Sequence, residues 1–106
     1  MSTYIAGPMT GYPDHNRPAF HEAAAAIREV KGMDWPITNP AEVELPDGAT
    51  WDDYMRIAVG VIAREVTEMV TLPGWECSRG ARIEVDLAHA LGITVLPLDV
   101  YLRGAA

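Results

Sequence analysis

The chain has 106 residues, 49% of them apolar, which is enough for one packed core and excludes a disordered chain. We expect a single domain over residues 1–106. The formal net charge of −7 argues against a general nucleic-acid binder, because such a protein needs a basic stripe on its surface. The one cysteine, Cys77, cannot form an internal disulfide, and no apolar run approaches membrane-spanning length. We therefore expect a cytoplasmic protein that binds no membrane.

The N-terminal region predicts a strand, a loop and a helix. Thr3–Ala6 is a short apolar run that stops at Gly7, as a buried strand does when it meets a loop. After the loop, Asn16 can cap a helix that has Pro18 in its first turn and ends at Gly32.

The middle of the chain predicts a second strand, a second helix and a third strand. The strand at residues 35–38 is the weakest of the set. Thr50 followed by Asp53 resembles a capping box, which begins a helix over residues 51–65. Residues 66–72 form the next predicted strand, which a proline-glycine pair ends.

The C-terminal region predicts a third helix and a fourth strand, at residues 93–96. Ser78 is a good N-cap, and the helical spacing after it is set by Ala81, Val85, Ala88 and Leu91. The order β-α-β-α-β-α-β predicts an α/β fold, with a small four-stranded parallel sheet and helices on its faces. Open parallel sheets bind ligands at the carboxyl ends of their strands, so we place the site at loops 7–16 and 73–77.

Glu84 is the residue to which we assign the chemistry. It lies in the second turn of the third helix, where the positive helix end, Arg79, Arg82 and loop N–H groups would keep it ionised. An ionised carboxylate can attack a sugar carbon or stabilise an oxocarbenium-like transition state. The alternative interpretation is an ordinary surface glutamate paired with an arginine.

The residues beside Glu84 predict a binding surface. Ser78, Arg79 and Gly80 form a donor-rich helix start that suits a phosphate or carboxylate, although an ordinary cap and a solvated arginine would look the same. The aromatic residues Trp51, Tyr54 and Trp75 can stack on a planar base, or seal the core or a subunit contact. The histidines show no metal-ligand spacing with Cys77, so we expect neither a metal nor a cofactor.

Four motifs occur together in this chain: YIAGPMTG near the start, NPAE in the middle, W-x-x-YMR at a helix start and LPGWE-x-SRGAR-x-E-x-x-x-A near the end. With them the chain resembles, over residues 3 to 98, a bacteriophage-type domain of uncharacterised function. That domain is similar to the nucleoside 2-deoxyribosyltransferase superfamily, which includes 2′-deoxynucleoside 5′-monophosphate N-hydrolases. The resemblance implies a flavodoxin-like or Rossmann-like fold that cleaves an N-glycosidic bond. It also implies a homodimer or higher oligomer, in the host cytoplasm if the protein is phage-encoded.

The resemblance also assigns roles to individual residues. Glu84 matches the family's nucleophile in its G-x-x-x-E-x-x-x-A context, and Tyr4 matches a tyrosine usually near that glutamate. Relatives often carry aspartates that position or protonate the base where this chain has Ala58 and Thr67. If an acid acts here, the candidates for it are Asp14, His15, Asp52 and Asp53. The residues expected to contact substrate are Gly7, Pro8, Met9, Asn39, Trp51, Tyr54, Trp75, Ser78, Arg79 and Gly80.

Three functions remain open at this point. The first is an enzyme that breaks the N-glycosidic bond of a small nucleoside or its 5′-monophosphate, as a hydrolase or a transferase. The second is a non-catalytic nucleotide-binding module that has lost the acid, as Ala58 and Thr67 would allow. The third is an interaction protein that docks a partner through exposed tryptophans.

Overall fold

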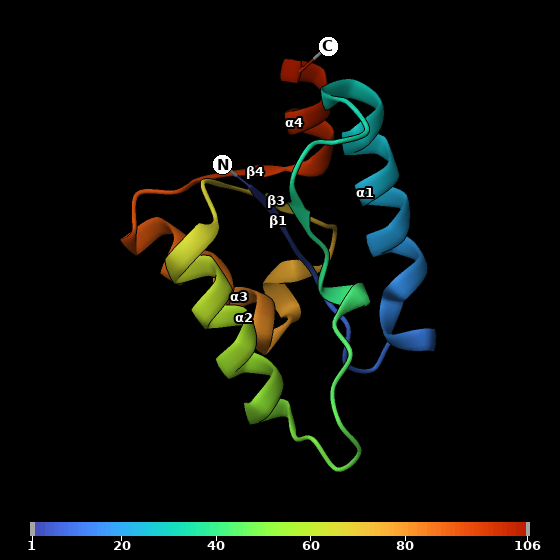
Figure 1. Ribbon diagram of the computed structural model, residues 1–106, viewed down its shortest axis with the longest axis vertical. Coiled ribbons are helices and arrows are strands. Elements are labelled where there is room, and N and C mark those ends of the chain that lie inside the picture. Colours follow the sequence, from blue (N-terminus) through green and yellow to red (C-terminus); the bar gives the residue numbers. More distant parts are fainter. Residues whose placement is uncertain (1, 106) are drawn as a thin grey trace.

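A four-stranded, all-parallel sheet lies between two pairs of helices (Figure 1). The computed structural model describes residues 2–105. The strands are β1 (Thr3–Ala6), β2 (Ile37–Thr38), β3 (Glu68–Thr71) and β4 (Thr94–Pro97), in the spatial order β2-β1-β3-β4. The direction of winding therefore reverses between β1 and β3, which is where doubly wound sheets open a crevice for ligands.

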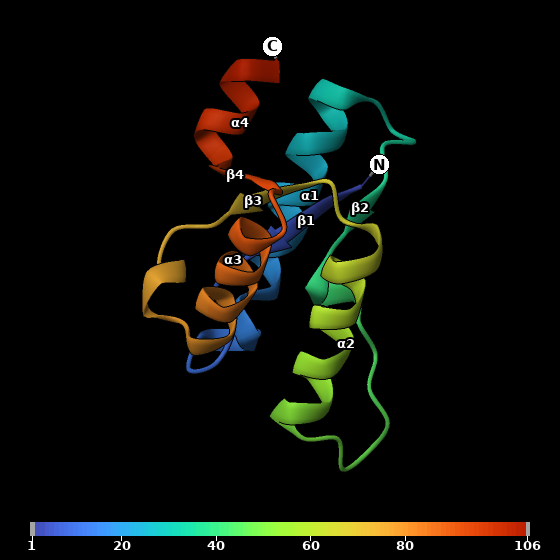
Figure 2. The same ribbon diagram turned by 90° about the vertical axis from the view of Figure 1, so that its left-hand side faces the viewer.

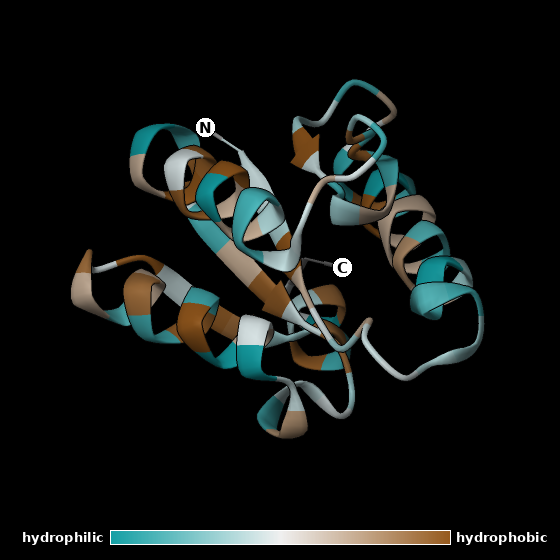
Figure 3. Cartoon of the chain, turned by 90° about the horizontal axis from the view of Figure 1, so that it is seen from below, coloured by the Kyte–Doolittle hydropathy of each residue, from teal (hydrophilic) through white to brown (hydrophobic). Residues whose placement is uncertain are grey.

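The helices cover the two faces of the sheet in pairs (Figure 2). One pair is α1 (Arg17–Lys31) with α4 (Leu98–Ala105), and the other is α2 (Trp51–Glu65) with α3 (Arg79–Ala90). Each longer helix carries both apolar and polar residues along its length, as an amphipathic helix on a sheet must (Figure 3). Short 3₁₀ turns follow the strands, and their bounds are η1 Pro13–Asn16, η2 Pro40–Glu42 and η3 Trp75–Cys77.

The side chains of β1 alternate between the two layers of the core. Tyr4 and Ala6 lie in the cluster under α2 and α3, whereas Ile5 lies in the cluster under α1 and α4. The alternation matters for the site, because it points the hydroxyl end of Tyr4 toward the same layer in which α3 presents Glu84.

The predicted fold class is confirmed: the chain has a small flavodoxin-like, Rossmann-like α/β fold with all predicted strands and helices in the predicted order. Two strands are shorter than predicted, at Ile37–Thr38 and Glu68–Thr71, because the residues beside them bond elsewhere. Trp35, for example, donates its indole N–H to Oγ1 of Thr3 at 2.9 Å. The sequence did not indicate α4.

Two local predictions about helix ends are wrong. Asn16 precedes α1 but has left-handed backbone angles (φ 61°) and makes no side-chain cap. Its Nδ2 instead donates to the carbonyl oxygen of Pro8 at 2.9 Å. Leu91, placed by its spacing on the buried face of α3, is 51% exposed, because the helix ends one residue before it. The caps at Thr50 and Ser78 are confirmed.

Within residues 2–105, no helix combines the length and the apolar character needed to cross a membrane.

Candidate functional site

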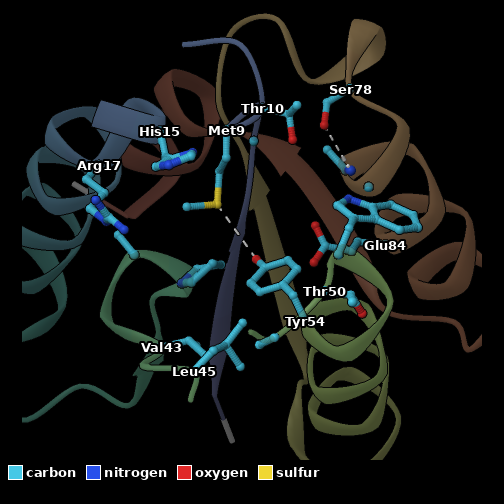
Figure 4. Close-up of a pocket in the computed structure, with 17 residues that line it drawn as sticks. Met9, Thr10, His15, Arg17, Val43, Leu45, Thr50, Tyr54, Ser78 and Glu84 are labelled. Atoms are coloured by element: carbon cyan, nitrogen blue, oxygen red, sulfur yellow. Dashed lines mark hydrogen bonds between the residues drawn. The ribbon is translucent and has the colours of Figure 1, made fainter. Parts of the chain in front are cut away.

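A cleft of about 380 Å³ opens at the carboxyl ends of the central strands (Figure 4). The loop after β1 forms one wall together with the start of α1, and the first turns of α2 and α3 form the other. Segment 40–50, which connects β2 to α2, closes the side between them. The volume of the cleft is in the range of pockets that hold small organic ligands, roughly 300–1,000 Å³.

Glu84 forms the floor of this cleft. It is only 4% exposed, because it lies on the same face of α3 as the buried residues Ala81, Val85 and Ala88. Its Oε2 accepts a hydrogen bond from the hydroxyl of Tyr4, which is fully buried behind it. No fully buried side-chain polar atom within residues 2–105 lacks a hydrogen-bond partner, so the second oxygen, Oε1, reaches the cleft.

The charge state of Glu84 differs from the one that the sequence predicted. Burial raises the pKa of the Glu84 carboxyl from 4.5 to about 7, although the hydrogen bond from Tyr4 acts in the opposite direction. Arg79 and Arg82, which we expected to hold it ionised, are exposed, and no described residue forms an ion pair with Glu84. The carboxyl therefore exchanges its proton near neutral pH.

Two tyrosine hydroxyls surround the carboxyl and stay protonated. Burial first, and then the charge of Glu84, raise the pKa of Tyr4 and of Tyr54. The hydroxyl of Tyr54 donates to Sδ of Met9 at 3.8 Å and lies in the middle of the cleft (Figure 4). The site therefore holds one acid near its midpoint of titration between two neutral donors.

The rim on the α2 and α3 side is built by contacts between the two helices. The guanidinium of Arg79 lies 4.4 Å from the centre of the Trp51 ring. A Cβ at Gly80 would lie 3.3 Å from Sδ of Met55 and 3.7 Å from Cζ2 of Trp51, so the absence of a side chain lets the two helices approach. Oγ of Ser78 accepts from the backbone N–H of Ala81 at 3.2 Å, which leaves its own proton free to donate into the cleft.

The opposite rim is a strained loop. Asp14, His15 and Asn16 are three consecutive non-glycine residues with positive φ, at 51°, 52° and 61°. Such conformations are uncommon and persist where the surrounding structure imposes them. Together with Arg17, which pairs with Asp14 at 3.0 Å, His15 lies across the cleft from Glu84 (Figure 4). The loop thus brings two basic side chains to the site.

A family model described as "Domain of unknown function (DUF4406)" matches residues 1–97. The chain belongs to this family. No curated protein matches it. The matched region contains every residue that lines the cleft and stops just before α4, so the cleft lies entirely within the DUF4406 domain.

The DUF4406 domain brings most of the predicted site residues together. Around the cleft lie Gly7, Met9, Trp51, Tyr54, Ser78, Gly80 and Glu84. Pro8 and Arg79 line an adjoining cleft, and Tyr4 lies behind Glu84.

Two predicted substrate-binding residues lie elsewhere. Asn39 is buried and structural: its Oδ1 accepts from the backbone N–H of Ala41 at 3.0 Å, and its Nδ2 lies 3.3 Å from Nδ1 of His21. Trp75 packs against the core under α2 and α3 and lines neither cleft. Both residues follow the end of a strand, but each side chain packs against other residues of the fold and does not face either cleft.

The structure also separates the four candidate acids. Asp53 accepts from the backbone N–H of Thr50 in the capping box, which lowers its pKa, and Asp14 is paired with Arg17. Of the four, His15 lines the cleft and Asp52 does not.

Several cleft residues were not indicated by the sequence, and they are Thr10, Arg17, Val43, Leu45 and Thr50. The loop 7–16 was identified, but which of its side chains turn inward depends on the left-handed run at its end. No group of three or more potential metal ligands occurs among residues 2–105.

Proposed function

We propose that the chain cleaves or transfers the N-glycosidic bond of a nucleoside or its 5′-monophosphate, with Glu84 as the nucleophile. The observation that carries the proposal is the pair of Tyr4 and Glu84 on the floor of a cleft of nucleoside size. The class of reaction comes from the resemblance of the sequence motifs to the nucleoside 2-deoxyribosyltransferase superfamily. We also propose that the chain forms homo-oligomers and acts in a phage-infected cell.

Glu84 reacts in its ionised form. Tyr4 holds Oε2, so Oε1 faces the sugar and attacks C1′ as the C1′–N bond breaks. The base leaves with the bonding electron pair and takes up a proton. Water, or a second base, then attacks C1′ and releases the Glu84 carboxylate, while the proton of the attacking group passes to His15, which completes hydrolysis or transfer.

His15 supplies the proton to the leaving base in this proposal. The positions at which relatives often carry aspartates hold Ala58, which is buried in the core, and Thr67, which bonds to Ser2. His15 lies on the wall opposite Glu84, where a base departing from C1′ would lie, and a protonated imidazole there can donate to that base.

The proposal predicts the acid side of the pH profile. Since Glu84 must be ionised to attack, and burial raises its pKa to about 7, kcat/KM on this side should rise as the pH increases through about 7. A nucleophile with an ordinary carboxyl pKa would already be fully ionised at pH 6.

The test is base release from a panel of ribo- and deoxyribonucleosides and their 5′-monophosphates, followed by chromatography. Glu84→Gln should abolish release, and Tyr4→Phe should reduce it, whereas Glu29→Gln on the exposed surface of α1 serves as the matched control. The proposal fails if no substrate releases its base, or if Glu84→Gln retains full activity.

A second candidate is a nucleotide-binding module without catalysis. It is favoured by one observation: Glu84 is the only carboxylate among the described residues that line the cleft, and burial raises its pKa to about 7. Calorimetry distinguishes the two candidates, because a module binds a nucleotide and returns it intact.

A further inference from the structure

A second cleft, of about 530 Å³, adjoins the one that contains Glu84. The two share four lining residues: Thr10, Trp51, Ser78 and Gly80. A ligand whose reacting part lies at Glu84 can therefore continue past Trp51 into the second cleft. The first cleft alone, at about 380 Å³, has the volume of a small-ligand pocket, so the second is available for a further part of the ligand.

The second cleft carries local positive charge on an acidic protein. Arg79 lines it, and no described residue pairs with Arg79 in an ion bridge. Neither Asp nor Glu lines this cleft, although the chain as a whole has a formal charge of −7. An anionic group is the ligand part that these surroundings favour over the rest of the surface.

Arg79 is also held in place. Its guanidinium is stacked 4.4 Å from the centre of the Trp51 ring, and Trp51 is half-buried between α2 and α3. A stacked guanidinium keeps its edge N–H donors free for a phosphate oxygen. Arg79 lines the second cleft and not the first, so it faces an anion that lies beyond the nucleoside.

The far wall offers a planar surface. Tyr12 is 43% exposed, and its hydroxyl packs against the turn after β3. That turn has Gly74 at φ 89°, where a Cβ would lie only 2.8 Å from the Tyr12 oxygen. The ring is therefore fixed in position while its face stays accessible to a second aromatic group.

We infer that the second cleft binds the distal half of a pyrophosphate-linked dinucleotide. Its proximal nucleoside 5′-phosphate lies in the first cleft at Glu84, its distal phosphate lies at Arg79, and its distal planar ring lies at Tyr12. This inference rests on the proposed function for the position of the proximal nucleoside, and it names the substrate class of that site.

Calorimetry with two sets of probes tests the inference. The first set is the nucleoside 5′-monophosphates, and the second is the symmetric dinucleoside diphosphates of the same bases. We expect the matching diphosphate to bind about tenfold tighter, the effect of one charge-assisted contact. Arg79→Gln should remove this gain and change the Kd of the monophosphate by less than about twofold. Arg82→Gln, an exposed arginine of the same helix that lines neither cleft, should change neither Kd.

The outcomes separate this inference from the proposed function. Equal affinity for both probes, equal effects of Arg79→Gln and Arg82→Gln, or tighter binding of a 3′,5′-linked dinucleotide would each overturn the inference. Base release from a monophosphate under those results leaves the proposed function standing. Arg79-dependent binding of the diphosphate without any base release supports the inference and refutes the proposed function. Absence of binding by every probe refutes the inference, and absence of base release from the whole panel of nucleosides and monophosphates refutes the proposed function.

Discussion

Replacing Glu84 with Gln should change how the stability of the protein depends on pH. Burial raises the pKa of this carboxyl from 4.5 to about 7, which makes the folded protein hold a proton that the unfolded chain has already lost. Below about pH 4.5 both states are protonated, and ionisation costs nothing. As the pH rises from about 4.5 to about 7, only the unfolded state is largely ionised, so the free energy of unfolding falls. Above about 7 both states are ionised, and the free energy of unfolding changes no further through this group.

The size of the effect follows from the two pKa values. At about 1.4 kcal/mol per pH unit, the difference between 4.5 and about 7 lowers the free energy of unfolding by about 3 kcal/mol across this window. Gln cannot ionise and avoids this loss. The stability of Glu84→Gln relative to wild type should therefore rise by about 3 kcal/mol between about pH 4.5 and about pH 8.

Urea denaturation followed by tryptophan fluorescence measures this difference at a series of pH values. The other ionisable groups are common to both proteins, so their contributions cancel when the two curves are subtracted. A difference that stays constant within about 0.5 kcal/mol would refute the burial of an ionisable Glu84. Tyr4→Phe gives an independent check: the loss of its hydrogen bond should raise the pKa of Glu84 further, so the window should extend to higher pH.

Gly7→Ala should destabilise the protein by about 1–3 kcal/mol, because the added Cβ would lie 2.9 Å from Cβ of Leu72. Thermal melting measures this, and Gly104→Ala, whose Cβ would meet nothing within 4 Å, should not lower the melting temperature, because alanine also favours the helix α4 more than glycine does. Tyr101→Phe should cost about 1.5 kcal/mol and speed hydrogen exchange in α4, because the Tyr101 hydroxyl donates to Oε1 of Glu68 at 2.6 Å. Burial raises the pKa of Tyr101 to about 12, so the loss should be constant through neutral pH, and unaltered exchange would contradict the role of this bond.

The features that the sequence predicted well depend on residues close together in the chain. The caps at Thr50 and Ser78 join groups three residues apart, so the pattern alone identifies them. The alternation of strands and helices likewise fixes a parallel sheet. By contrast, α4 follows Pro97 directly, and Tyr101 anchors it through a bond to a strand 33 residues earlier, which no local pattern reveals.

In the site, too, features set by neighbouring residues were predicted, and features set by residues far apart in the chain were not. Its motif identified Glu84, but the raised pKa depends on burial of the carboxyl beside Tyr4, which is 80 residues away in the chain. From the sequence we considered only the nearby arginines, and we therefore expected an ionised Glu84 rather than a carboxyl with a raised pKa. Asn39 differs from Glu84: a conspicuous motif marked it for substrate, and its Oδ1 holds the 3₁₀ turn after β2.

The ends of the sheet constrain how copies of this chain can associate. At one edge β2 is two residues long, and at the other β4 ends in Pro97, which has no N–H to donate. A neighbouring chain would gain few backbone hydrogen bonds by adding a strand at either edge. Any oligomer must therefore be built from side chains on helices and loops, so single surface substitutions should be able to dissociate it without unfolding the subunits.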